Sequence, residues 1–190
     1  MRRVLIVSPH FPPVNAPDMQ RVRISLPYVR EFGWEPYVLA VSPEASDTID
    51  PLLNETIPAD VLVERVRAVP SRVSRPLGIG NIALRAMPFL YAAGRRLIAE
   101  RRIDLVYFST TMFFALPLAR VWKHQSGVPY VLDFQDPWLT DYYDTHPGAA
   151  PPRKYHLARR LHAVLEPWTM LRADGLVSVS PDYIRALHER

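Results

Sequence analysis

Val4-Leu5-Ile6-Val7, followed at once by Ser8-Pro9, is a short and largely β-branched apolar run near the start of the chain. A run of this kind is typical of a strand that is buried on both faces, as strands of a parallel sheet are. Runs of similar character recur along the sequence, at 36–41, 61–66, 105–109, 128–134 and 176–180. The sequence therefore predicts a six-stranded sheet.

Between these runs, apolar residues recur every three or four positions, which is the spacing of an amphipathic helix. Helices are predicted over residues 18–32, 82–97, 111–125, 157–168 and 182–190. We expect Asp18 to cap the first helix, Gly33 to end it, and Pro27 to kink or shorten it. The alternation predicts an α/β, Rossmann-like domain over residues 1–190, with a mostly parallel sheet covered by helices on both faces.

The composition is that of an ordinary globular domain, with 190 residues, 48% of them hydrophobic and 22% charged. The chain has no cysteine, which excludes disulfides and thiolate chemistry. The net charge of +4 comes mostly from dispersed arginines, which we interpret as solvated helix faces rather than as a nucleic-acid surface. No apolar run reaches the ~18 residues of a membrane span or the pattern of a signal peptide, so we expect a cytoplasmic protein.

Ligands of an open parallel sheet bind beyond the carboxyl ends of its strands. The loops 9–18, 110–112 and 135–146 follow the first, fourth and fifth strands, so we expect them to line the site. The first loop has no glycine, which argues against a dinucleotide fingerprint and a Walker-type loop. The helix after it could hold an anion by its free amides, with a charged contact from Arg21. The alternative is that Asp18 is only a cap and Arg21 is solvated.

The fifth strand leads into Asp133-Phe134-Gln135-Asp136-Pro137-Trp138. Strand alternation places Asp133 and Gln135 on one face, and Asp136 at or past the strand end. A carboxylate at this position is a candidate to accept a proton or a hydrogen bond from a substrate hydroxyl. Trp138 offers an aromatic wall for a sugar ring. The alternative is an aspartate that ties down its own loop and a tryptophan that is partly core.

No metal centre or hydrolase triad is predicted. The histidines are dispersed without the spacing of a zinc motif, and no G-x-S-x-G elbow is present. The acidic residues after the fifth strand match no calcium loop; they are Asp133, Asp136, Asp141 and Asp144.

Several segments, in order, resemble family 4 glycosyltransferases of the two-Rossmann-domain (GT-B) architecture. They are Val4 to Pro13, Gln20-Arg21, Glu31 to Glu35, Asp133 to Trp138, and the closing Ala173 to Ser180. The resemblance implies that residues 1–190 are the N-terminal, acceptor-side domain of an enzyme that moves a hexosyl group from a nucleotide sugar to an acceptor hydroxyl. It also implies that the C-terminal domain, which binds the donor, is absent, so that this chain alone is inactive.

By this resemblance the acceptor is a sugar or a lipid-linked molecule of polysaccharide or glycolipid biosynthesis. No metal is expected and this domain holds no cofactor, while Asp136 is the candidate catalytic residue. The residues expected around the acceptor are Asn15, Asp18, Arg21, Thr110, Gln135 and Trp138. Two departures leave the identity of the acceptor open. Asn15-Ala16-Pro17 replaces a Gly-Gly pair of many members, and Gln135 or Asp136 stands where many have a histidine.

Three other interpretations remain. A stand-alone binding or scaffold module, paired with a separate catalytic domain, would show an apolar patch at Ile184 and Leu187 on the final helix. A nicotinamide-dependent oxidoreductase is disfavoured by the glycine-free first loop. Peripheral membrane contact is suggested by the arginine-rich helix at 89–102, although a core-facing helix with a charged outer face is the plainer interpretation.

Overall fold

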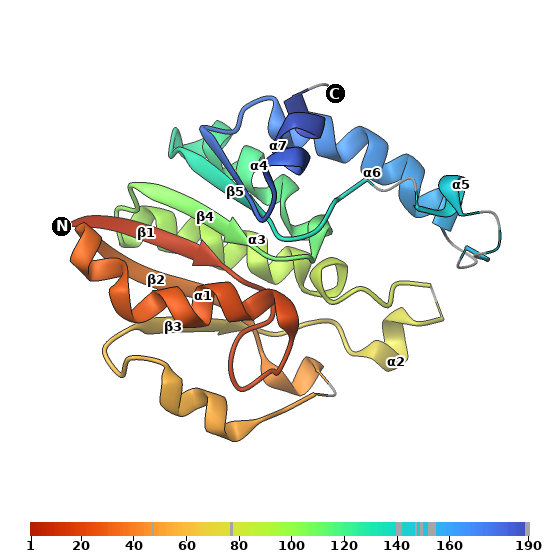
Figure 1. The fold of residues 1–190 in the computed structure, drawn as a ribbon. Helices are drawn as coiled ribbons and strands as arrows, with labels where there is room; N and C mark the ends of the chain where they lie inside the picture. Colours follow the sequence, from red (N-terminus) through yellow and green to blue (C-terminus); the bar gives the residue numbers. More distant parts are fainter. Residues whose placement is uncertain are drawn as a thin grey trace.

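The structure, a computed structural model, describes residues 1–46, 48–76, 78–139, 142–146, 148, 150–151 and 155–188. Its centre is an all-parallel sheet in the order β3-β2-β1-β4-β5-β6 (Figure 1). The strands are β1 (Arg2–Val7), β2 (Trp34–Val41), β3 (Leu62–Val66), β4 (Leu105–Ser109), β5 (Tyr130–Phe134) and β6 (Gly175–Ser178). The predicted Rossmann-like sheet is therefore confirmed, and its strand order reverses between β1 and β4.

Helices connect successive strands. The α-helices are α1 (Gln20–Ser25), α2 (Ser71–Ser74), α3 (Ile82–Glu100), α4 (Pro117–Ser126), α5 (Tyr142–Thr145), α6 (Tyr155–Met170) and α7 (Pro181–His188). Short 3-10 helices supplement them: η1 (Pro17–Met19), η2 (Leu26–Phe32), η3 (Pro43–Ala45), η4 (Pro51–Thr56) and η5 (Phe113–Ala115).

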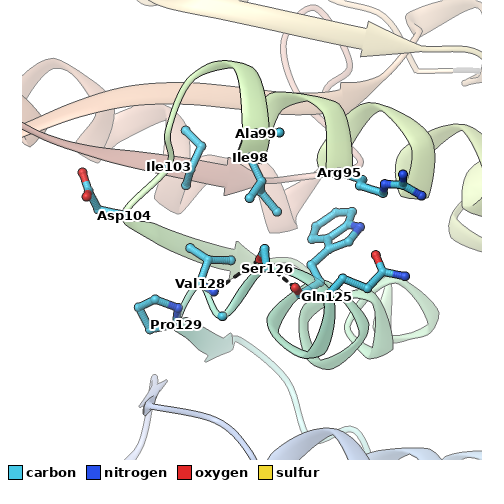
Figure 2. A pocket seen from close by; sticks show the side chains of 11 residues that line it. Arg95, Ile98, Ala99, Ile103, Asp104, Gln125, Ser126, Val128 and Pro129 are labelled. Atoms are coloured by element: carbon cyan, nitrogen blue, oxygen red, sulfur yellow. Dashed lines mark hydrogen bonds between the residues drawn. The ribbon is translucent and has the colours of Figure 1, made fainter.

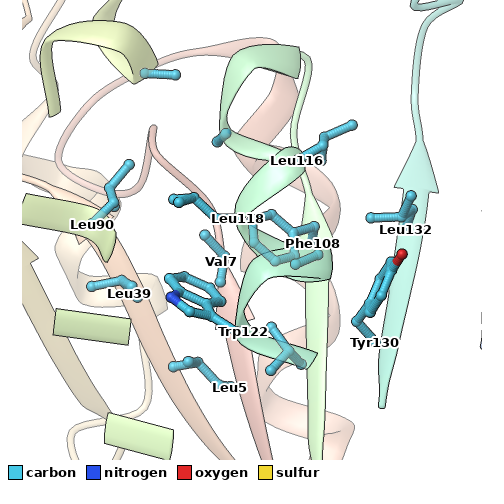
Figure 3. Packing of buried hydrophobic residues seen from close by; sticks show 14 of the residues in the cluster. Leu5, Val7, Leu39, Leu90, Phe108, Leu116, Leu118, Trp122, Tyr130 and Leu132 are labelled. Atoms are coloured by element: carbon cyan, nitrogen blue, oxygen red, sulfur yellow. The ribbon is translucent and has the colours of Figure 1, made fainter. Parts of the chain in front are cut away.

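The core lies on both faces of the sheet, because side chains along each strand alternate between them. In β1, Leu5 and Val7 pack with residues of α3 and α4, including the buried Trp122 (Figure 3). Val4 and Ile6 pack on the other side, against residues of α1 and η2. The expectation of helices on both faces is confirmed.

The first helix begins differently from the prediction. Asp18 is not its cap: the cap positions of η1 and α1 are Ala16 and Met19, and neither makes a side-chain capping bond. Asp18 lies inside η1 with its side chain buried, because it bonds to residues distant in sequence. The effect of Pro27 is confirmed, since the α-helix gives way to the 3-10 helix η2 one residue before it. Gly33 ends that helix with a φ of 83°.

Two C-terminal helices place their apolar residues unexpectedly. On α7, Leu187 is 4% exposed and belongs to the core and Ile184 is half-buried, so the two do not form the open patch expected of a scaffold module. On α6, Leu165 packs against the core, but most of the predicted apolar face is exposed to solvent. Periodicity identifies a face of a helix without telling which side of the molecule it meets.

Helix α3 has the core-facing orientation. Leu90 and Leu97 are buried against the sheet, and Arg96 on the outer side pairs with Glu64 and Glu100. In the described part of the chain, no helix combines the length and the apolar character that crossing a membrane requires.

Candidate functional site

A group of buried polar side chains lies at the carboxyl edge of β1, β4 and β5, where the sequence predicted the site. Asp18, Ser109, Thr110 and Asp133 are all at most 3% exposed. Burial of polar groups at this density costs free energy unless each is hydrogen-bonded. Two of the bonds in this group join segments more than a hundred residues apart, and a third joins residues 92 apart, so the site is a feature of the tertiary fold.

Asp18 is one centre of this network. Its Oδ1 lies 2.9 Å from Nδ1 of His10, and its Oδ2 accepts from the Thr110 hydroxyl at 2.8 Å and from the backbone N–H of Thr111 at 3.3 Å. Burial opposes ionisation of this carboxyl, but the bond to His10, the charge of His10 and the bond from Thr110 together hold the pKa of Asp18 below its usual value. Asp18 is therefore a carboxylate that orients the imidazole of His10.

Asp133 is the second centre. Its Oδ1 accepts from the Arg21 guanidinium at 2.8 Å, and its Oδ2 accepts from the Ser109 hydroxyl at 2.7 Å. Burial, followed by the nearby Asp133 charge, raises the pKa of Tyr107 well above its usual value. Arg21 keeps a third of its side chain exposed, so its guanidinium reaches from the buried carboxylate to solvent. The interpretation of Arg21 as merely solvated is wrong.

Gln135 joins the two centres. Its Nε2 donates to the backbone oxygen of Asp18 at 2.7 Å and to Oγ of Ser109 at 2.9 Å. Strand alternation predicted this arrangement, since Gln135 lies two residues after Asp133 and both bond to Ser109. The loops after β1, β4 and β5 are thereby fixed to one another by side-chain bonds.

Four of the seven predicted site residues meet in this network: Asp18, Arg21, Thr110 and Gln135. Asn15 is exposed, and its backbone N–H donates to Thr48 instead. Asp136 is exposed two residues beyond β5, with no hydrogen bond or ion pair to any residue that the structure describes.

Trp138 does not offer an open face to a ligand. Its side chain is 3% exposed and stacks on Phe113 with ring centroids 5.6 Å apart, beside the ring of His162 at 6.0 Å. Burial lowers the pKa of His162. The Trp138 backbone N–H donates to the Tyr183 hydroxyl of α7 at 2.9 Å. The alternative interpretation of Trp138 as core is therefore confirmed, because the turn after β5 folds the indole under η5 and α6.

Sequence reasoning left out His10 and Ser109, which complete the network. His10 lies immediately after Ser8-Pro9, inside the loop 9–18 that we expected to line the site. Its position in that loop was the feature of the sequence that could have identified it as a site residue. A histidine held by a carboxylate at one ring nitrogen can accept a proton at the other. With the side chain of His10 16% exposed, the dyad of His10 and Asp18 can accept a proton from a bound hydroxyl.

One prominent cavity lies elsewhere. It has a volume of about 540 Å³ and is lined by residues that precede β4 and β5, such as Asp104 and Pro129, together with Arg95, Trp122 and Gln125 (Figure 2). This places it at the amino-terminal edge of the strands, opposite the polar network. None of the network residues lines it.

The described residues contain no group of three or more histidine or acidic side chains arranged to hold a metal ion. Asp141 and the side chain of Asp144, two of the carboxylates considered above, lie outside the described residues.

Comparisons with known proteins agree with the fold. The chain matches UGT2 of Phytolacca americana with a TM-score of 0.56 at 12% identity, covering 94% of this chain and 46% of that one. It matches UGT89C1 of Arabidopsis thaliana, solved in complex with UDP, with a TM-score of 0.50 at 16% identity, covering 100% and 46%. The chain thus spans about half the length of these structures, and no curated protein matches it.

The family comparison is more specific, because the model of the glycosyl transferase 4-like domain matches residues 18–190. This range includes Arg21, Thr110 and Gln135 and all but the first strand of the sheet. The chain belongs to the glycosyl transferase 4-like domain family.

Proposed function

We propose that this chain is the acceptor-side half of a glycosyltransferase that moves a hexosyl group from a nucleotide sugar to an acceptor hydroxyl. The observation that carries the proposal is the polar network at the carboxyl edge of the sheet, in a chain of this family. The network offers hydrogen-bonding groups and a carboxylate-held imidazole, which suit a hydroxyl compound.

The donor diphosphate is expected to bind to groups outside these loops. The first loop has no glycine to let the backbone approach a phosphate. Arg21, the cation in the network, is already paired with Asp133. Charge on the leaving diphosphate therefore needs cations from another domain, since stabilisation of that charge is a dominant part of phosphate-leaving chemistry. This supports the proposal that the chain alone is inactive and that a C-terminal domain supplies the donor site.

In the transfer, the acceptor oxygen forms a bond to the anomeric carbon and the bond from that carbon to the diphosphate oxygen breaks. The acceptor proton passes to a base. We propose His10, which Asp18 orients, or Asp136, which is exposed two residues after β5, as that base. We propose a sugar or lipid-linked acceptor of polysaccharide or glycolipid synthesis, and a cytoplasmic location.

The test uses the product of the complete reading frame that contains this chain, because a donor domain encoded after Arg190 is part of the proposal. Release of nucleoside diphosphate from UDP-, GDP- and ADP-hexoses is measured with a membrane lipid extract as the acceptor source. Asp136→Ala and His10→Ala are compared with Glu55→Ala, which replaces an exposed acidic residue on η4 that takes no part in the polar network.

We expect acceptor-dependent turnover in the wild type, at least a hundredfold loss in the variant that lacks the base, and full activity in Glu55→Ala. The loss should occur without a change in the melting transition. Wild-type turnover in Asp136→Ala would show that Asp136 is not the base. Wild-type turnover in both variants would show that neither His10 nor Asp136 accepts the acceptor proton. No release of diphosphate from any donor, with the complete protein folded, contradicts sugar transfer.

A further inference from the structure

Helix α6 has an inverted distribution of polar and apolar side chains. Glu166 and Thr169 are buried, and His162 is half-buried, so polar groups face the interior. The other side carries four exposed apolar residues, and Leu171 continues their row directly after the helix ends, where its N–H donates to the Pro167 carbonyl. We call these five, with exposures from 38% to 76%, the outer apolar stripe: Leu157, Leu161, Val164, Trp168 and Leu171. A surface helix ordinarily buries its apolar side, so the inversion makes this face of α6 a candidate for contact with another surface.

The outer apolar stripe is continuous. Its members are spaced four, three, four and three residues apart, which keeps them on one side of the helix. At 1.5 Å per residue the stripe is about 20 Å long. Figure 1 shows α6 at the periphery of the molecule, on the side of the sheet formed by β5 and away from β3.

A cationic pocket adjoins the end of the stripe. It has a volume of about 640 Å³ and is lined by Arg120, Val121, Lys123, His124, Trp168 and Arg172. Every charged residue of this lining is basic. The charge of Lys123 is neutralised by Asp174, which lies 2.7 Å away. Among the residues that the structure describes, the lining contains no acidic side chain to neutralise Arg120 and Arg172.

Trp168 belongs to both features and joins them. The Arg120 guanidinium lies over its ring, 4.4 Å from the centroid, and also donates to the Trp168 backbone oxygen. The indole is therefore held at the boundary between the apolar stripe and the cations. An amphipathic tryptophan beside an arginine is an arrangement that suits the interface between acyl chains and charged headgroups.

We propose that this face of α6 binds the surface of an anionic lipid bilayer, with the outer apolar stripe at the acyl boundary and the cationic pocket on lipid phosphates. Apolar burial and attraction to anionic headgroups act together in such binding. The basic pocket favours an anionic surface over a second copy of this chain, whose net charge of +4 would add further positive charge. The proposal does not depend on the sugar-transfer reaction.

This surface differs from the arginine-rich helix that the sequence suggested. On α3, apolar side chains such as Leu90 and Leu97 are buried against the sheet, and Arg96 is paired with two glutamates. Charge that is already paired gains little from an anionic membrane, whereas the cationic pocket beside α6 keeps basic groups that can be neutralised by lipid.

The test is co-sedimentation of the purified protein with vesicles of phosphatidylcholine, with and without phosphatidylglycerol, at low and at high salt. The stripe variant is Leu161→Gln/Val164→Gln, and its matched control is Phe32→Gln/Leu52→Gln, which changes two exposed apolar residues on other elements. The charge variant is Arg120→Gln/Arg172→Gln, with Arg72→Gln/Arg75→Gln as its control. Circular dichroism establishes that each variant is folded.

We expect the wild type and both controls to bind the anionic vesicles at low salt and to be released at high salt. The stripe variant and the charge variant should each bind at least tenfold more weakly. The proposal is overturned if the folded wild type does not bind, if neutral vesicles bind as strongly, or if the stripe variant stays within twofold of the wild type. Self-association that the stripe variant abolishes, without vesicle binding, would assign the face to a second copy instead.

Discussion

Replacing Gly94 by alanine adds one methyl group at the tightest contact between α3 and α4. A Cβ at this position would lie 2.1, 2.4 and 2.8 Å from three ring atoms of Trp122. The indole is 1% exposed, its Nε1–H donates to the Tyr91 carbonyl at 3.3 Å, and it packs near Phe108 with ring centroids 5.6 Å apart. Figure 3 shows the apolar side chains that enclose it.

The expected cost follows from these distances. Carbon atoms in contact lie about 3.5–4.0 Å apart, so the indole must retreat by roughly 1.5 Å into a packed core. Overpacking of this kind costs about 1–3 kcal/mol, and a rigid, enclosed ring takes the substitution to the upper end of that range or beyond. Alanine regains up to about 1 kcal/mol over glycine in a helix. We therefore expect Gly94→Ala to lower the free energy of unfolding by about 2 kcal/mol.

Urea unfolding followed by far-ultraviolet circular dichroism measures this free energy, and the melting temperature should fall by roughly 4–8 °C. Gly80→Ala is the control, because a Cβ there meets no atom within 4 Å and the glycine φ is not positive. It should be neutral or slightly stabilising. Combining Gly94→Ala with Trp122→Phe should cost less than the sum of the two. A change below 0.5 kcal/mol in Gly94→Ala, or strict additivity in the double variant, refutes the reasoning.

Arg21→Ala leaves the buried carboxylate of Asp133 without its cation, and we expect it to lower the free energy of unfolding by about 3 kcal/mol. This is the lower end for a broken buried ion pair, because Arg21 is partly exposed. The control Arg23→Ala, two residues further along α1, should change the free energy of unfolding little. Asn81→Ala removes the side-chain oxygen that accepts from two backbone N–H groups at the start of α3, at a cost of about 1 kcal/mol in urea unfolding, while the exposed Asn54 tolerates the same change. Because the folded-state pKa of Asp18 is depressed, its carboxylate stabilises the fold above the unfolded value of 3.8 and loses that effect as pH falls through the lower folded value. The difference in unfolding free energy between wild type and Asp18→Asn should therefore be full near neutral pH and shrink below pH 3.8; a difference that stays constant into acid contradicts the assignment.

The central strands were predictable because burial on both faces of a parallel sheet leaves a continuous apolar run, as in β1. The edge strands β3 and β6 are only partly buried, and β3 carries Glu64 and Arg65. The position of the network was predictable for a similar reason: parallel strands all end at one edge, so the loops after β1, β4 and β5 had to meet. Within it, the shared face of Asp133 and Gln135 followed from alternation alone.

Roles that depend on distant partners were not predictable. Asp18 precedes a helix and has the chemistry of a cap, but Thr110, 92 residues away, provides its hydroxyl partner. Trp138 follows a strand end, where an exposed ring is plausible, yet η5 and α6 cover it. The outward face of α6 was also hidden, because the sequence gives the period of a helix but not the direction of its apolar side. Whether the network binds an acceptor remains a prediction.

The bond from the Trp138 backbone N–H to the Tyr183 hydroxyl connects the turn after β5 to the C-terminal helix α7. Tyr183 is on α7, and Asp136 lies only two residues before the bonded N–H. The Tyr183 ring also packs edge-on against Phe134 of β5, with ring centroids 5.9 Å apart. The final helix is thus attached both to the end of β5 and to the turn that carries the exposed carboxylate, so the stability of α7 and the position of that turn depend on the same side chain.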